Sequence, residues 1–167
     1  MAQAVSRETL GAWLLKGNPA VWDVRRFLAE GHDVLTSWSV RPGYRSVLMR
    51  PGDRVVFWLS GPGTGGLVRG VWGLGHVVAE PEPWTDAERG WWVDDGARQA
   101  LRARVEVHVP LLEEPLPASE LRAAGITDLE VQRVPQGSNP SWVSRPQLDA
   151  LETLLPGWPA APPPRTA

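Results

Sequence analysis

A chain of 167 residues with no cysteine and a net charge of −2 has the length of a single domain, and it can form neither disulfides nor thiolate metal sites. The near-neutral balance argues against an indiscriminate nucleic-acid binder, which is normally basic. No apolar run has the length of a membrane span, and the first residues lack the pattern of a signal peptide, so we expect a cytoplasmic protein with no membrane contact.

The amino-terminal part of the chain predicts two strands and one helix. Residues 12–17 are typical of a short strand, and residues 36–40 of a second one. Between them, residues 18–31 predict a turn and a helix of about two turns that ends at a glycine. Residues 41–53 predict a basic loop.

The third predicted strand, residues 55–59, is the most apolar. Because side chains alternate along a strand, its two faces carry Val55, Phe57 and Leu59 on one side and Val56, Trp58 and Ser60 on the other. The first face is plain core. The face with Trp58 suits either a second buried layer or the wall of a pocket, and both interpretations make this a central strand.

Residues 67–80 predict a fourth strand, and residues 81–97 a long loop. The fourth strand contains three glycines that indicate bulges or close backbone approaches: Gly70, Gly73 and Gly75. Residues 101–110 alternate strictly between apolar and polar side chains, as in a strand with one face in water. Residues 117–125 predict a short helix.

The carboxyl-terminal part predicts one more strand over residues 129–134, followed by a well-defined helix. Ser144 is its N-cap, and Gln147 completes a capping box. Residues 156–167 are rich in Pro and Ala and predict a disordered tail. The sum is one α+β domain over residues 1–155, with five to six short, mostly antiparallel strands and about three flanking helices around a small barrel or strongly curved sheet.

Two features of the composition bear on function. Residues 1–79 hold nine Lys and Arg against five Asp and Glu, whereas residues 80–167 hold eight against fourteen. Sixteen of the seventeen basic residues are arginine, whose planar guanidinium suits phosphate, although a GC-rich genome gives the same bias without any function. Ten tryptophans against one tyrosine and two phenylalanines exceed what core filling explains.

The motifs of common enzymes are absent. The sequence has no nucleophile elbow, no phosphate-binding Gly-Lys loop and no zinc-protease helix, and its three histidines are scattered. Asp94 and Asp95 are adjacent, so their side chains point apart in an extended segment, and the sequence around them is that of an ordinary turn. We expect no catalytic residue, no metal and no cofactor.

Trp38 offers a different chemistry. Ser37 and Ser39 flank it at the predicted mouth of a strand, and a ring beside small hydroxyl groups can hold a flat heterocycle. The alternative is that Trp38 is a core residue at the end of the sheet. If its partner is a base, removing Trp38 should leave the stability of the fold nearly unchanged, whereas removing Trp58 should be costly.

Six segments, taken in order, resemble the EVE domain, a PUA-like family related to YTH domains. The resemblance covers roughly residues 12–155 and is carried by "WLLKGNPAVWD", "SWSV", "PGDRVVFWLSG", "VWGLGHVVAEP", "RARVEVHV" and "VPQGSNPSWVSRPQLDALETL". It implies a pseudo-barrel with helices outside and a pocket in which an aromatic cage receives a flipped, modified base. EVE relatives are linked to modified cytosine such as 5-methylcytosine in DNA, and YTH relatives to N6-methyladenine.

The resemblance also implies which residues bind the base. By likeness to the YTH motif, Trp38 and Ser39 form one wall and Asn18 reads the base edge, while Trp91 or Trp92 supplies a second ring. Similar positions in EVE sequences add four residues: Trp22, Trp58, Ser60 and Gly61. The connector "GPGTGGLVRG" is longer and richer in glycine than the family pattern, and this difference falls at the expected rim of the pocket.

The favoured hypothesis is therefore a stand-alone, non-enzymatic reader of a modified base in DNA or RNA. We expect three arginines that flank the Trp38 wall to contact phosphates: Arg41, Arg45 and Arg50. We expect no nuclease or translocase module to be fused to the domain, and therefore expect any effector to be a separate protein. The alternatives are a modified-RNA binder of the YTH type, a small ASCH-type hydrolase or nuclease built on Lys16, Asp23, Tyr44 or His76, and a protein-interaction module with exposed tryptophans.

Overall fold

The computed structural model of the chain describes residues 4–62, 65–83 and 102–163. Its centre is one six-stranded mixed sheet in the order β2-β5-β4-β3-β1-β6. The strands are β1 (Leu10–Gly17), β2 (Val34–Val40), β3 (Arg54–Leu59), β4 (Gly70–Pro83), β5 (Ala103–Pro117) and β6 (Ser141–Ser144). β1 and β3 run parallel, and every other neighbouring pair is antiparallel. The predicted α+β fold with mostly antiparallel strands is confirmed, and its sheet stays open, with β2 and β6 as edges.

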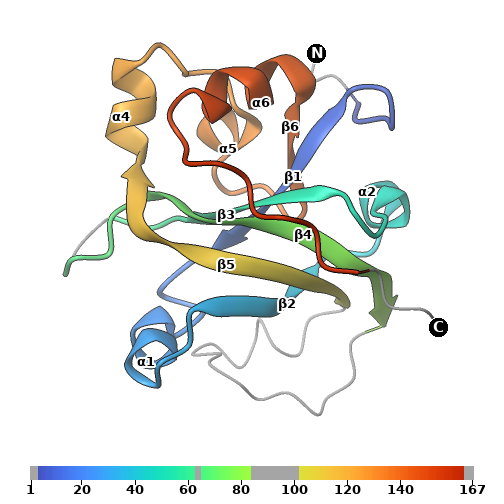
Figure 1. Cartoon of the computed structure of the whole chain (residues 1–167). Coiled ribbons are helices and arrows are strands. Elements are labelled where there is room, and N and C mark those ends of the chain that lie inside the picture. The colour runs from blue at the N-terminus through green and yellow to red at the C-terminus, as the bar shows by residue number, and fades with distance from the viewer. Residues whose placement is uncertain (1–3, 63–64, 84–101, 164–167) are drawn as a thin grey trace.

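Short helices cover both faces of this sheet. The described residues form α1 (Val24–Ala29), α2 (Tyr44–Leu48), α4 (Ala118–Ala123), α5 (Glu130–Arg133) and α6 (Arg145–Glu152). Figure 1 shows α4, α5 and α6 above the sheet, α1 below it and α2 at one side. The expected N-cap of α6 is present, because the Ser144 hydroxyl accepts a hydrogen bond from the Gln147 amide while Gln147 bonds back to the Ser144 amide.

Two buried layers lie on opposite faces of the sheet, as the alternation of β3 predicts. Phe57 belongs to the layer between the sheet and α1, together with Trp13 and Trp38. Trp58, the next residue along the strand, belongs to the layer under α4, α5 and α6. Trp58 is only 3% exposed, so the second face of β3 is a second core layer.

Close backbone approach explains the glycines of β4. A Cβ on Gly73 would lie 2.9 Å from a methyl carbon of Val109, and a Cβ on Gly75 would overlap the carbonyl of His108 on the neighbouring strand. The two strands that meet here, β4 and β5, have 14 and 15 residues, so they are longer than the short strands we expected. Register shifts along their pairing bend the sheet.

Three local predictions were wrong. Residues 129–134 contain helix α5 where a strand was expected, and the basic loop 41–53 contains helix α2. Strand β6 was not foreseen. In the segment after residue 155, the Trp158 indole packs on the second core layer, donates to the Gly75 carbonyl at 3.0 Å and lies 4.9 Å from the Arg54 guanidinium.

Candidate functional site

The parallel strands β1 and β3 finish side by side, and the chain turns away from both at the same end of the sheet. Ser60, just after β3, donates to the Gly17 carbonyl through its amide at 2.8 Å and its hydroxyl at 3.1 Å. Asn18 follows Gly17, and its side-chain oxygen accepts a hydrogen bond from the Ala20 amide at 2.9 Å. The carboxyl ends of parallel strands are a frequent place for ligands, since loops diverge there.

Asn18 lines two separate cavities at this end of β1 and β3. The first, which we call the aromatic cavity, has a volume of about 140 Å³ and is lined by Lys16, Asn18, Val21, Trp22, Trp38, Ser39, Arg102 and Asn139. The second, the arginine cavity, has a volume of about 490 Å³ and includes Asn18, Trp58, Ser60, Gly61, Arg69 and Arg122 in its lining. Because Trp38 and Trp58 belong to different core layers, the two cavities lie on opposite sides of the sheet.

Two rings form a corner in the aromatic cavity. The Trp22 and Trp38 centroids lie 4.9 Å apart with the ring planes at 84°. Phe57 supports Trp38 from a third direction, at 5.0 Å and 70°. Both tryptophans are almost fully buried, and the Trp38 indole donates to the Lys16 carbonyl at 3.2 Å. These contacts fix the orientation of both rings before any ligand arrives.

Polar atoms surround these rings. Asn139 holds the main chain of Lys16 on both sides: its Oδ1 accepts from the Lys16 amide at 2.8 Å, and its Nδ2 donates to the Lys16 carbonyl at 3.0 Å. The Ser39 hydroxyl is buried and has no hydrogen-bond partner among the described residues. A buried hydroxyl without a partner is costly, and in a cavity lining it marks a place where a ligand atom would be stabilised.

Lys16 joins the cavity wall to the loop that precedes β6. Its ammonium donates to the carbonyls of Gly137 and Pro135. Burial lowers the pKa of Lys16, the nearby Arg45 lowers it further, and Glu130 acts in the opposite direction. The ammonium therefore has carbonyl partners, and its role in this geometry is to hold the wall.

The base-binding residues predicted from the sequence divide between the two cavities. Trp22, Trp38 and Ser39 line the aromatic cavity, and Trp58, Ser60 and Gly61 line the arginine cavity, with Asn18 common to both. Trp91 and Trp92 lie outside the described residues.

The expectation that Trp38 is separable from the core was wrong. The ring is 6% exposed, belongs to the core layer under α1, and also lines a cavity. Trp38 is therefore both a core residue and part of the cavity wall, two roles that the sequence analysis treated as alternatives.

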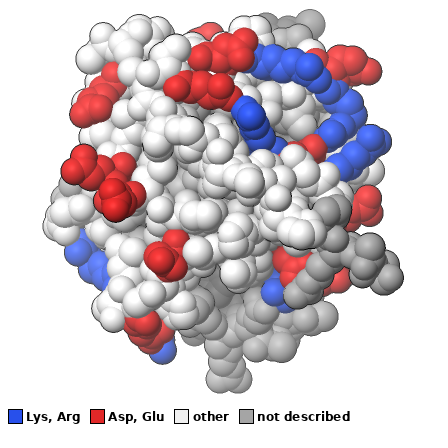
Figure 2. Space-filling view, in the orientation of Figure 1, with Lys and Arg blue, Asp and Glu red and all other residues white. Residues whose placement is uncertain are grey.

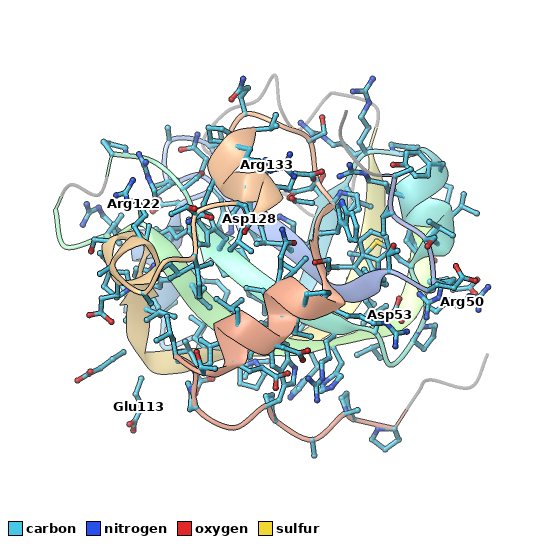
Figure 3. All side chains as sticks on the ribbon, turned by 90° about the horizontal axis from the view of Figure 1, so that it is seen from above. Arg50, Asp53, Glu113, Arg122, Asp128 and Arg133 are labelled. Carbon is cyan, nitrogen blue, oxygen red and sulfur yellow. The ribbon has the colours of Figure 1, made fainter. Side chains whose placement is uncertain are left out.

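The three arginines predicted to contact phosphates occupy different settings. Arg45 forms a bidentate pair with Glu130, with Nη1–Oε1 at 2.6 Å and Nη2–Oε2 at 2.8 Å. Its guanidinium is therefore already paired with a carboxylate of the same chain. Arg50 is exposed beside Asp53, ahead of β3 and so at the opposite end of that strand from Ser60 (Figure 3). Arg41 is exposed, and its amide donates to the carbonyl of Asn139, next to the aromatic cavity. Of the three, Arg41 is the one that bonds to a residue of that cavity lining.

Charge gathers unevenly on the face shown in Figure 2. Basic side chains are grouped mainly at the upper right, with acidic ones beside them, and further acidic side chains are scattered over the rest of this face. Part of the basic charge of the chain is paired, since Arg7 bonds to Asp53 and Arg54 to Glu152. Among the described residues, part of the positive balance of residues 1–79 is thus already neutralised by carboxylates.

The residues that could serve a hydrolase do not converge. Lys16 lines the aromatic cavity, Asp23 caps α1 by accepting from the Arg26 amide, Tyr44 is 56% exposed on α2, and His76 is buried in β4. Within the described ranges no group of three His, Asp or Glu side chains is placed to hold a metal ion. No helix of the described part of the chain is long and apolar enough to cross a membrane.

Several lining residues escaped the sequence analysis. Asn139 and Arg102 of the aromatic cavity, and Arg69 and Arg122 of the arginine cavity, carried no motif. Asn139 lies within the segment that resembles the EVE domain, so that segment held a signal for its position but not for its role.

The open curved sheet with short helices on both faces makes this an α+β domain, and the arrangement fits a PUA-like fold. The profile of the EVE domain matches residues 11–149, and the chain belongs to the EVE domain family. The resemblance found in the sequence is thereby confirmed.

Two solved structures share this fold. One is a protein of Pseudomonas syringae with a TM-score of 0.51, and the other a protein of Pseudomonas putida with a TM-score of 0.54. Each is 18% identical to this chain, and each alignment covers 86% of this chain and 98% of the other. At this identity the likeness concerns the fold alone. No curated protein matches the chain.

Proposed function

We propose that the protein is a non-enzymatic reader that binds a modified nucleobase, flipped out of its strand, in the aromatic cavity. The observation that carries the proposal is the buried Ser39 hydroxyl, which has no partner among the described residues and lies in a cavity walled by two rings. Aromatic faces attract a flat base, and a hydroxyl can donate to or accept from its edge.

The size of the cavity favours a pyrimidine over a purine. A volume of about 140 Å³ is well below the roughly 300–1,000 Å³ of pockets that hold whole small molecules, so one small ring is the natural occupant. This favours a modified cytosine over N6-methyladenine, the base of the YTH type, as the ligand, and it applies to DNA and RNA alike.

Energetics decide which modification can be read sharply. Extruding a base costs a few kcal/mol, and stacking on an aromatic ring returns about 1–3 kcal/mol per base. A methyl group adds only about 0.8 kcal/mol by burial, which is less than tenfold in affinity. A hydroxymethyl or formyl group offers a hydrogen bond, and Ser39 is positioned at the cavity to supply the partner.

The proposal places the protein in the cytoplasm, with DNA or RNA that carries a modified base as its partner, and a separate nuclease or other effector would act on what it binds. The hydrolase alternative gains no support from the geometry, because its four candidate residues lie in different parts of the fold.

Calorimetric titration tests the proposal. Short single strands of DNA and RNA would carry one unmodified, 5-methyl, 5-hydroxymethyl or N6-methyl base, and we expect the tightest binding for a DNA strand with a modified cytosine. Ser39→Ala should reduce the preference for hydroxymethylcytosine over cytosine by about tenfold, as loss of a hydrogen bond predicts. Ser37→Ala is the matched control, since Ser37 flanks Trp38 but is not part of the cavity lining. Equal affinity for all bases, or no binding to either nucleic acid, would refute the proposal.

A further inference from the structure

The arginine cavity has the size and composition of a ligand site in its own right. Its volume of about 490 Å³ lies within the usual range for bound small molecules. Trp58 forms part of its apolar side, below the loop after β3 and the helices α4 and α5. None of the described residues that line it is acidic, although the chain from residue 80 onward has a clear excess of Asp and Glu.

Two guanidinium groups come to this cavity from different elements. Arg69 precedes β4, and its Nε donates to the Gly61 carbonyl at 2.7 Å, which orients the group, while its two Nη atoms have no hydrogen-bond partner among the described residues. Arg122 comes from α4 and is exposed at the end of the molecule opposite Arg50 (Figure 3). Two arginines with no carboxylate in the same lining are the usual arrangement for a bound phosphate.

The two cavities are separate, but they share a lining residue and a supporting loop. Asn18 lines both, and the Pro135 loop that closes one side of the arginine cavity accepts hydrogen bonds from Lys16 of the aromatic cavity. Gly61 completes the shared edge, because its φ of +105° and a Pro19 carbon 3.3 Å from any added Cβ keep the loop tight against Asn18. To occupy both cavities, a nucleic-acid strand would cross Asn18, which lines each of them.

We propose that the arginine cavity binds the nucleotide adjoining the flipped base, holding its phosphate between Arg69 and Arg122, so that the protein recognises a dinucleotide step. This inference rests on the proposed function. It adds a second subsite, on the opposite face of the sheet, with an anionic rather than an aromatic basis for binding. Asn18 is the boundary between the two subsites and contributes to both.

The experiment compares a nucleoside with dinucleotides. The probes are 5-hydroxymethyl-2′-deoxycytidine and the two DNA dinucleotides that carry this base in the first or second position. Calorimetry measures affinity, and indole ¹H–¹⁵N shifts of Trp38 and Trp58 show which cavity is occupied. We expect the nucleoside to shift Trp38 only, and one of the two dinucleotides to shift both and to bind at least tenfold more tightly.

Arg122→Ala and Arg69→Ala should each remove about tenfold of dinucleotide affinity and leave nucleoside affinity unchanged, since a charged hydrogen bond is lost only from the second subsite. Arg133→Ala is the matched control: it removes the same charge from the neighbouring helix α5, outside the cavity lining (Figure 3). Thermal unfolding of each variant verifies that it is folded.

The outcomes separate this inference from the proposed function. If both dinucleotides bind no better than the nucleoside, or if the gain survives both arginine variants, the second subsite is wrong while the aromatic cavity stands. If the nucleoside fails to bind or to shift Trp38, the proposed function is wrong and the second subsite falls with it.

Discussion

The side-chain amide of Asn139 pairs with the main chain of Lys16 as a neighbouring strand would. Its oxygen accepts from the Lys16 amide at 2.8 Å, and its nitrogen donates to the Lys16 carbonyl at 3.0 Å. The same carbonyl accepts from the Trp38 indole at 3.2 Å. One asparagine thus fixes the last residues of β1 and, through a shared acceptor, the ring that forms the cavity wall.

Replacing Asn139 should therefore lower the free energy of unfolding. Asn139→Ala leaves the Lys16 amide without its partner, which should cost about 1–3 kcal/mol in unfolding free energy. Asn139→Asp keeps an acceptor for the amide but sets a carboxylate oxygen against the Lys16 carbonyl, so it should be at least as costly. Chemical denaturation measures both, with the exposed neighbour Ser138 replaced by Ala as the control. A neutral Asn139→Ala would show that the pairing does not hold β1.

Strand alternation carried the parts of the fold that the sequence predicted well. In β3 the alternation of large apolar residues is uninterrupted, so the division of Phe57 and Trp58 between two layers follows from local geometry alone. The same holds for the capping box at Ser144, which needs only four residues to be recognised.

Short elements set by tertiary contacts were not predictable in this way. Residues 129–134 alternate like a strand, but a single helical turn forms because the Gln132 side chain accepts from the Leu129 amide while Leu129 and Val131 enter the second core layer. Strand β6 has four residues, too few for a period, and exists through its pairing with β1. The arginine cavity joins residues distant in the chain, so no local pattern marks Arg69 or Arg122.

Trp38 and Trp58 should now behave alike in stability measurements. Both rings are buried in core layers, at 6% and 3% exposure, so Trp38→Ala and Trp58→Ala should each cost about 3–5 kcal/mol. Val47→Ala, at a side chain 82% exposed, is the control and should change little. Denaturant unfolding measures the three variants. A Trp38→Ala protein as stable as the parent would show that the ring does not belong to the core.

Gly17 is a second position where the cavity wall and the core meet. A Cβ at this residue would lie 2.8 Å from Phe57 Cζ and 3.3 Å from Trp38 Cζ2. Since Phe57 is fully buried and cannot retreat, Gly17→Ala should cost about 1–3 kcal/mol and displace the Trp38 ring. Gly43→Ala is the control, because that residue has extended backbone and open space. Unfolding and the Trp38 indole shift measure the effect, and an unmoved indole would contradict it.

The three predicted phosphate-binding arginines should separate by their settings. Arg41 is exposed next to Asn139, so Arg41→Ala should lower the slope of log affinity against log salt by about one unit on a short oligonucleotide. Arg50→Ala should leave that slope unchanged, since Arg50 lies before the first residue of β3, at the end of that strand opposite the two cavities. Salt-dependent binding titrations check both. An equal effect of the two would mean that the strand runs along the whole length of β3.

Arg45→Ala should act on stability instead. Its guanidinium is paired with Glu130, whose other contact is the Ser141 hydroxyl at 2.9 Å. Burial alone would raise the pKa of Glu130, but the hydrogen bonds from Arg45 and Ser141 outweigh it and lower that pKa. Breaking a largely buried pair leaves Glu130 without its cation, and the cost should reach about 3–5 kcal/mol. The double variant Arg45→Ala, Glu130→Ala should recover part of this loss in denaturation experiments, and purely additive effects would exclude the coupling.

His76 should make the fold sensitive to mild acid. It is 6% exposed in β4, opposite His108 on β5, and its Nδ1 is buried with no hydrogen-bond partner among the described residues. Burial lowers the pKa of His76 below its ordinary value of 6.5, and the charges of Arg54 and His108 lower it further.

The sign of the effect follows from proton uptake. Below pH 6.5 the unfolded chain takes up a proton at His76 that the folded protein still excludes, so stability falls as the pH drops from 6.5 to the folded pKa. The contribution of one proton to the slope is at most about 1.4 kcal/mol per pH unit. His76→Gln removes this group, so its unfolding free energy should fall less than that of the parent between pH 7 and pH 5. His32→Gln, at an exposed histidine, is the matched control and should follow the parent. Denaturant unfolding at several pH values tests the point, and parallel curves for His76→Gln and the parent would show that protonation of His76 is not linked to folding.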